Sequence, residues 1–191
     1  MLSIVALILL LLPQGAAPRP APAVESVYTD LDVKKCKTVE EEAEGYSWTK
    51  ACAGAGGYRL HWLMGDERES ITVVKPDGTE HPLEFWSTVS PAFSSVGPRA
   101  EWRVRRRGNR VEPYALIVRL NANENPDRQK IVSYLVVVRL GPDKTCVTEK
   151  VPPGQRANEL ARRAADNSAA KPCLRGIGEE AAGRGGGSRR L

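Results

Sequence analysis

Alternating apolar and polar residues predict that most of this chain forms β-strands. From Tyr58 to Met64 every second residue is apolar or aromatic, which is the period of a strand with one buried face. The segments Ile71 to Lys75 and Thr79 to Leu83 have strand-like composition and flank the turn residues Pro76-Asp77-Gly78, a pattern typical of a hairpin. Residues 100–107 and 110–120 flank Gly108-Asn109, which suits a two-residue hairpin loop.

Further strands and one helix complete the predicted fold. Ile131 to Leu140 is strongly apolar and β-branched, so we expect a central strand covered on both faces. Val39 and the segment from Tyr46 to Cys52 indicate another hairpin. Gln155 to Asp166 has helical periodicity, with one apolar stripe formed by Ala157, Leu160, Ala161 and Ala164. The predicted fold class is α+β and mainly β: an antiparallel sheet, as a sandwich or an open barrel, with one C-terminal helix.

Both ends of the chain differ from its middle. Leu2 to Leu12 is an apolar run too short for a membrane span, which needs about 20 residues, and Ala21-Pro22-Ala23 resembles a cleavage site. We therefore expect residues 1–23 to be a signal peptide, although no Lys or Arg precedes the run; a buried N-terminal helix is the alternative. Residues 176–191 are rich in Gly and Arg and are predicted to be disordered. Residues 24–175 would form a single domain, and the mature chain would contain no transmembrane span.

The charge of the predicted domain is small. The whole chain carries a formal charge of +5. Arg19 leaves with the leader, and residues 174–191 hold four Arg and two Glu, so residues 24–173 carry a charge near +2. Composition alone therefore does not indicate a nucleic-acid partner.

Four cysteines, Cys36, Cys52, Cys146 and Cys173, follow the leader, and an exported chain meets an oxidising compartment. They allow three disulfide connectivities. We expect Cys36–Cys52, which would close the first hairpin, and Cys146–Cys173, which would tie a strand to the far end of the helix. Each bond would contribute about 3–4 kcal/mol in the chain-entropy model. A metal site is disfavoured because no pair has CxxC spacing and neither histidine is near a cysteine in sequence.

The common catalytic and cofactor motifs are not present in the sequence. It contains no GxSxG, HExxH, phosphate-binding loop or dinucleotide fingerprint, so we expect no cofactor. A hydrolase would have to bring together polar residues that are far apart in sequence, such as His61 with Asp66 or Glu69. The alternative is that His61 is a solvated strand residue and the carboxylates belong to a charged connecting loop.

A group of arginines at one hairpin tip is the candidate anion-binding site. Arg103, Arg107 and Arg110 are its main members, and lipid headgroups, polyanionic sugars or an acidic protein surface would be the partners. A hairpin closed by Gly108-Asn109 would instead pair Arg107 with Arg110, Arg105 with Glu112 and Arg103 with Tyr114. Most of the cluster would then be a solvated edge that resists aggregation.

Several short segments carry a resemblance to a known family. They are Val27-Tyr28-Thr29-Asp30-Leu31-Asp32 ahead of Cys36, Ser95-Val96-Gly97-Pro98 with Glu101-Trp102-Arg103, Ala115-Leu116-Ile117-Val118-Arg119, and Ala157-Asn158 followed by Leu160 to Asp166. In this order they resemble a family of small exported, uncharacterised proteins of Gram-negative bacteria. The resemblance implies export, a cysteine after the first segment and another near the C-terminal helix, and it supplies no activity.

Two functions remain open on the sequence. The first is a non-catalytic periplasmic or envelope protein that acts as a binding or accessory module, with an envelope protein or an anionic surface as its partner. An exposed aromatic patch from Phe85, Trp86 and Phe93 would favour it, although such residues also belong in cores. The second is the small hydrolase described above.

Overall fold

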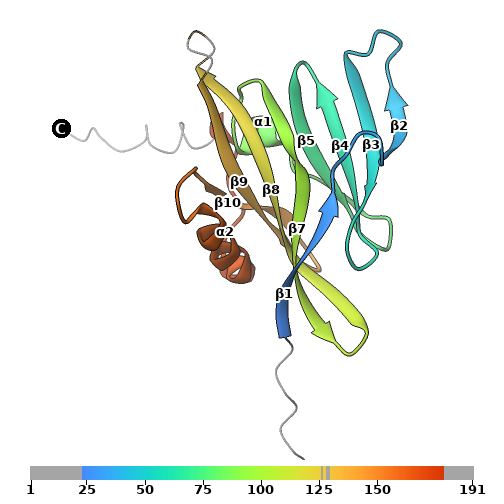
Figure 1. Ribbon diagram of the computed structural model, residues 1–191, viewed down its shortest axis with the longest axis vertical. Helices are drawn as coiled ribbons and strands as arrows, with labels where there is room; N and C mark the ends of the chain where they lie inside the picture. The colour runs from blue at the N-terminus through green and yellow to red at the C-terminus, as the bar shows by residue number, and fades with distance from the viewer. Residues whose placement is uncertain (1–22, 126, 128–129, 179–191) are drawn as a thin grey trace, which may run out of the picture.

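The structure is a computed structural model that describes residues 23–125, 127 and 130–178 (Figure 1). The predicted signal peptide up to residue 22 and the tail from residue 179 lie outside the described residues. None of the described helices is long and apolar enough to cross a membrane. The elements are β1 Ala23–Asp30, β2 Lys37–Glu41, β3 Ser47–Ala53, β4 Arg59–Gly65, β5 Arg68–Val74, β6 Glu80–Pro82, α1 Phe85–Thr88, β7 Ser94–Arg107, β8 Arg110–Asn125, β9 Lys130–Leu140, β10 Thr145–Val151, α2 Ala157–Asp166 and the 3-10 turn Ser168–Ala170.

The strands form one sheet in the order β10-β9-β8-β7-β5-β4-β3-β2, with β1 paired to β7 and β6 paired to β5. All pairings are antiparallel except a single parallel contact, Arg68 of β5 against Ser94 of β7. The mainly β fold class with one C-terminal helix is confirmed, and the sheet is mixed at this one point. Because β5 and β7 share so little pairing, the sheet divides into two halves. One half contains β2 to β6, the other contains β1 and β7 to β10, and the sheet bends at the junction so that the halves face each other.

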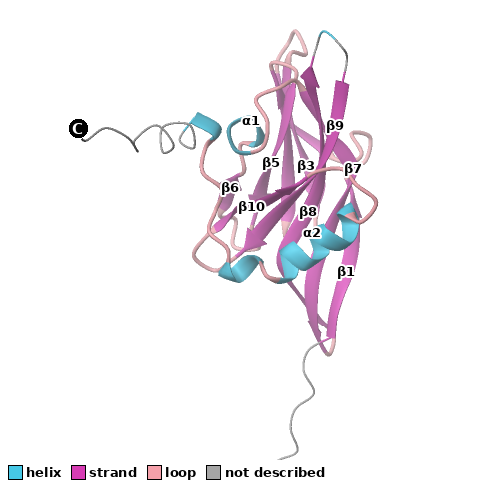
Figure 2. Ribbon diagram, turned by 90° about the vertical axis from the view of Figure 1, so that its left-hand side faces the viewer, coloured by secondary structure: helices cyan, strands magenta, loops and turns pink. Residues whose placement is uncertain are grey.

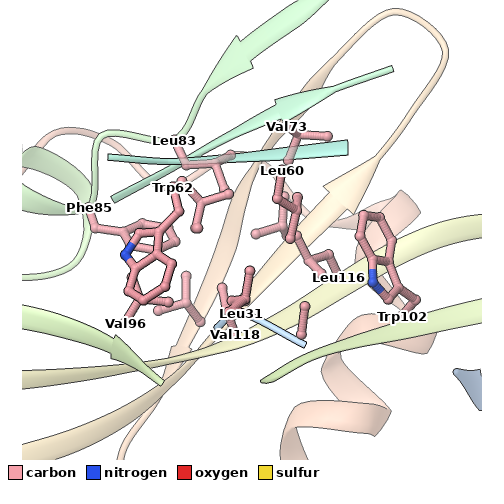
Figure 3. Packing of buried hydrophobic residues seen from close by; sticks show 14 of the residues in the cluster. Leu31, Leu60, Trp62, Val73, Leu83, Phe85, Val96, Trp102, Leu116 and Val118 are labelled. Carbon is pink, nitrogen blue, oxygen red and sulfur yellow. The ribbon is translucent and has the colours of Figure 1, made fainter. Parts of the chain in front are cut away.

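The two halves pack face to face around the main core (Figure 3). Leu60, Trp62, Ile71 and Val73 from one half meet Trp102, Val104, Leu116, Val118, Val136 and Val138 from the other. Trp102 is fully buried, and its Nε1–H donates to Thr29 Oγ1 at 2.9 Å. Gly54 lets this ring approach the backbone, since a Cβ at residue 54 would lie 2.7 Å from Trp102 Cζ2.

A second, smaller core lies on the other face of β8 and β9, beneath α2 (Figure 2). Leu135 and Val137 face this helix while Val136 and Val138 face the main core, so the prediction that this strand is covered on both faces is confirmed. The helix is buried through Ala161, Ala164 and Ala165. The predicted stripe is wrong at Leu160, which is 45% exposed. Alanines allow α2 to lie close to the sheet, and this orientation turns Leu160 to the solvent.

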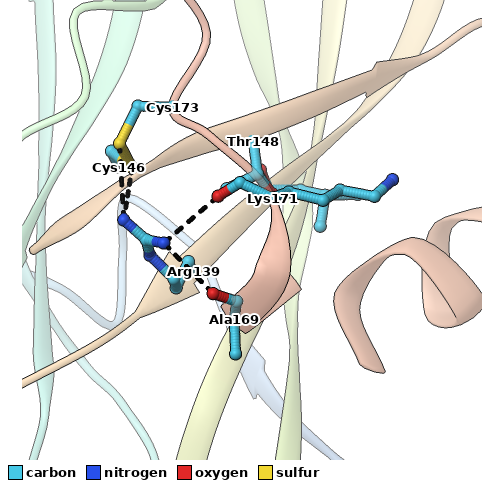
Figure 4. Close-up of a disulfide and its surroundings, with 7 residues drawn as sticks. Arg139, Cys146, Thr148, Ala169, Lys171 and Cys173 are labelled. Atoms are coloured by element: carbon cyan, nitrogen blue, oxygen red, sulfur yellow. Dashed lines mark hydrogen bonds between the residues drawn. A yellow bond between two sulfur atoms is a disulfide. The ribbon is translucent and has the colours of Figure 1, made fainter. Parts of the chain in front are cut away.

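Both expected disulfides are present. The N-terminal disulfide, Cys36–Cys52, has a Cα–Cα distance of 4.5 Å, and the C-terminal disulfide, Cys146–Cys173, has one of 5.7 Å. Arg139 lies against the C-terminal disulfide, with its Nη2 3.6 Å from Cys173 Sγ and 3.8 Å from Cys146 Sγ (Figure 4). Its Nη1 donates to the backbone oxygen of Lys171, so the same arginine also holds the chain that follows α2.

The β7–β8 hairpin differs from its predicted register at one position. Arg107 pairs with Arg110 and Arg105 with Glu112, as expected. A bulge between Arg103 and Val104 then shifts the register, so that Arg103 pairs with Ala115 and not with Tyr114. The bulge brings the Tyr114 ring under Arg105, whose Cζ lies 4.1 Å from the ring centroid.

Candidate functional site

An aromatic hollow is formed by residues of the β2–β3 hairpin, the β4–β5 hairpin and the segment from α1 to β7. It consists of two adjoining cavities of about 410 and 600 Å³ that share Ser47 and Met64. Its apolar lining residues are Tyr46, Trp48, Leu63, Met64, Trp86 and Phe93. Tyr46 is 71% exposed and Phe93 is 45% exposed, so two aromatic rings at this site lack the cover that core aromatics have.

The β2–β3 turn places Tyr46 at the edge of the hollow. Glu42 N–H donates to Ser47 O at 3.1 Å, and Gly45 N–H donates to Glu42 O at 2.8 Å. Gly45 has φ +72°, a conformation that glycine adopts without steric cost. The N-terminal disulfide joins the residue before β2 to β3 and so holds this hairpin against the rest of the sheet.

The β4–β5 turn forms another part of the rim. Asp66 and Glu67 have φ of 52° and 55°, the backbone of a two-residue hairpin turn of the primed type. Such a left-handed conformation costs a non-glycine residue about 1–2 kcal/mol. The turn is held by Ser94 N–H, which donates to Glu67 O at 3.0 Å, and by an ion pair of 3.0 Å between Arg68 and Asp66.

The polar lining of the hollow is predominantly acidic. Its carboxylates belong to Glu40, Glu42, Asp66 and Glu67, against the single guanidinium of Arg68. Arg68 Nε is buried and has no hydrogen-bond partner among the described residues. The arrangement combines exposed aromatic surface with a field that favours cations.

The expected aromatic patch is only partly present. Trp86 and Phe93 line the hollow, whereas Phe85 is fully buried in the main core and its N–H donates to Ser70 Oγ at 3.0 Å. Sequence reasoning did not assign Tyr46 or Met64 to this site. No local signal marks them, because each belongs to a strand or turn whose own pattern is ordinary.

The groups that a hydrolase would use are not brought together. His61 lies on the face of β4 opposite Trp62, and its Nδ1 is 3.4 Å from Glu80 Oε1. Glu69 faces the other side, where it accepts hydrogen bonds from Trp62 Nε1–H at 3.0 Å and Val96 N–H at 2.5 Å. Burial raises the pKa of Glu69 although these bonds act in the opposite direction. Glu69 therefore links two strands and does not form a pair with His61. Asp66 belongs to the β4–β5 turn, where it is paired with Arg68.

The arginines of the hairpin tip do not share one site. Arg103 is directed away from the tip, and its Nε and Nη2 donate to the two carboxylate oxygens of Asp166 at 2.8 and 3.0 Å. Arg107 is 66% exposed and lies 3.6 Å from Glu112, and Arg110 is exposed beside it. Anion binding at this tip remains a prediction, and of its three residues Arg107 and Arg110 are exposed at the tip.

Among the described residues there is no group of three or more His, Cys, Asp or Glu side chains that could hold a metal ion. Comparison of the chain with protein-family models, with curated proteins and with solved structures found no match. The resemblance to small exported proteins is therefore still a prediction.

Proposed function

We propose that this protein is an exported, non-catalytic binding module that holds a basic, apolar-rich segment of a partner polypeptide in the aromatic hollow. The observation that carries this proposal is the convergence of Tyr46 and Phe93, two exposed aromatic side chains from separate turns, on one cavity that adjoins, through Met64, the cavity lined by Trp86. Exposed aromatic anchors in a concave site are typical of polypeptide recognition.

The charge of the rim specifies the kind of segment. Four carboxylates face the hollow and one of them, Asp66, is already paired with Arg68. A lysine or arginine in the bound segment would pair with the remaining three, Glu40, Glu42 and Glu67, while its apolar neighbours cover the aromatic rings. An acidic segment would be repelled.

The disulfides support both the binding role and the proposed location. The N-terminal disulfide fixes the hairpin that presents Tyr46, so less conformational entropy is lost when a partner binds. Two disulfides are also typical of proteins that leave the reducing cytosol, in agreement with a periplasmic or secreted location.

The test uses the oxidised protein and two synthetic peptides of alternating residues, one of Lys and Leu and one of Glu and Leu. Titration calorimetry should detect saturable binding of the Lys-Leu peptide only. The double variant Tyr46→Ser with Phe93→Ser should weaken that binding, by about tenfold if the two rings together contribute near 1.4 kcal/mol. The matched control is Ile131→Ser, since Ile131 is 60% exposed and does not line the hollow.

The proposal fails under either of two results. One is binding of the Glu-Leu peptide as tightly as the Lys-Leu peptide, because the acidic rim would then have no role. The other is an equal loss of affinity in the Ile131 control, because binding would then follow general surface hydrophobicity.

A further inference from the structure

A second hollow, separate from the aromatic one, lies where β1, the start of β7 and the N-terminal half of α2 border β8 and β9. Its volume is about 360 Å³. Its charged lining residues are Arg99, Arg119, Arg162 and Glu101, and it also includes Tyr28, Gly97, Pro98, Ile117, Leu135 and Asn158. Three guanidinium groups against one carboxylate leave this small cavity with a net charge of +2, and we call it the arginine hollow.

The only carboxylate of the arginine hollow is already satisfied. Glu101 accepts Arg162 Nε–H at 2.6 Å and Nη2–H at 3.3 Å, and it also accepts the Ser26 hydroxyl at 2.6 Å. Arg162 Nη2 further donates to the Tyr28 hydroxyl at 2.9 Å. This network holds Arg162 and Tyr28 in place at one wall.

The other two arginines form no ion pair with a carboxylate among the described residues. Arg119 Nη1 donates to the neutral hydroxyl of Ser133 at 2.9 Å, and Arg99 is exposed at the mouth. Arg99 lies opposite Asp30 of β1, and this carboxylate is paired with Lys35 at 2.6 Å and also attracts the charge of Arg99. Arg119 thus faces the cavity without a carboxylate partner among the described residues, and Arg99 shares the Asp30 carboxylate with Lys35.

The backbone is shaped to bring Arg119 to this position. A Cβ at Gly97 would lie 2.8 Å from Arg119 Cβ, 3.3 Å from its Cγ and 3.4 Å from its Cδ. Real side chains do not tolerate the first of these distances, so only glycine at residue 97 allows the stem of Arg119 to cross β7 here. Behind the charges the cavity has an apolar floor, since Ile117 and Leu135 are both buried.

The geometry points to a binding site for a small molecule that carries an oxyanion, a carboxylate or a phosphate group, on a compact apolar body. The oxyanion would accept hydrogen bonds from Arg119 and Arg99, which present planar forks of donors suited to it. The Asn158 amide and Tyr28 hydroxyl would contact the polar edge, and the apolar body would cover Ile117 and Leu135. This site does not depend on the function proposed for the aromatic hollow.

The test compares three probes by calorimetry at physiological salt: phenyl phosphate, inorganic phosphate and phenol. Phenyl phosphate should bind saturably and more tightly than either of the others, because only it supplies both the oxyanion and the apolar body. Arg119→Gln and Arg99→Gln should each weaken it by about tenfold, the effect of losing one charge-assisted hydrogen bond of near 1.4 kcal/mol. Because Arg99 is exposed, its variant retains the fold even if Arg119→Gln alters packing.

The matched control replaces Arg59 and Arg175, which are exposed and do not line the hollow, with Gln; it removes two charges and should leave the affinity unchanged. Equal weakening in this control would show binding by net charge only and would overturn the proposal. The proposal would also be overturned if inorganic phosphate bound as tightly as phenyl phosphate, or if phenyl phosphate showed no saturable binding. Retention of the protein on phosphatidylglycerol vesicles that is lost in Arg99→Gln would reassign the ligand to a membrane headgroup, and would also overturn it.

Discussion

Replacing Arg103 with Met should destabilise the protein, because in the structure Arg103 fastens α2 to the sheet. The guanidinium binds both oxygens of Asp166, and its Nη1 also donates to Ser26 Oγ at 2.7 Å. The Tyr114 hydroxyl donates to the same carboxylate at 2.6 Å. The variant would leave Asp166 with one partner and Ser26 without its donor.

The expected magnitude follows from exposure. Arg103 is 11% exposed and Asp166 is 38% exposed. An exposed ion pair contributes about 0–1 kcal/mol, and breaking a fully buried pair costs about 3–5 kcal/mol. We expect the free energy of unfolding to fall by about 2 kcal/mol, between these two limits. The melting temperature of a domain of this size should then fall by about 4–8 °C.

The assay is urea unfolding of the oxidised protein in a double-mutant cycle of Arg103→Met with Asp166→Asn. The coupling should be about 1 kcal/mol or more, and the matched cycle of Arg107→Met with Glu112→Gln should give less than about 0.5 kcal/mol, because that pair is exposed. A coupling near zero for the first cycle would refute the anchoring role. Arg103 would then be available for the anion binding that the sequence suggested.

The same pair predicts a dependence on pH. Burial alone would raise the pKa of Asp166, but hydrogen bonds from Arg103 and Tyr114 outweigh it and hold the pKa below its ordinary value of 3.8. The stabilisation is therefore complete above the pKa of the unfolded chain and is lost as pH falls through the lowered value. The difference in stability between the wild type and Arg103→Met should shrink in acid, and a constant difference would contradict this assignment.

Two other expectations concern single contacts. Gly54→Ala should lower the free energy of unfolding by about 1–3 kcal/mol, since its Cβ would overlap Trp102 and the backbone oxygen of Tyr58. The control is Gly154→Ala, whose Cβ would meet nothing within 4 Å. Equal urea midpoints for the two variants would contradict the expectation. The C-terminal disulfide should be reduced before the N-terminal one, because the Arg139 guanidinium stabilises the thiolate that leaves. Arg139→Met should slow its reduction by dithiothreitol, followed by alkylation and mass spectrometry, and an unchanged rate would remove Arg139 from this explanation.

The local elements of this protein follow from its amino-acid pattern. Alternation with a period of two and turn residues act within about ten neighbouring positions, so the hairpins around residues 76–78 and 108–109 could be predicted. The disulfide pairing was predictable because it joins the cysteines that are closest in sequence, 16 and 27 residues apart. The helix was predictable as an element, but not which face it buries, because packing on the sheet turned Leu160 outward.

The places where side chains from distant segments meet depend on long-range packing, which no local pattern encodes. The single parallel contact between β5 and β7 lets the sheet fold over, and the bulge after Arg103 changes which residues face each other across the hairpin. The parallel contact brings Tyr46 and Phe93 to the same cavity. The local sequence around either residue does not indicate that the other lies nearby. Arg99, Arg119 and Arg162 converge because β7 and β8 are paired in the sheet and α2 packs on this face, and that packing joins residues that are far apart in the chain.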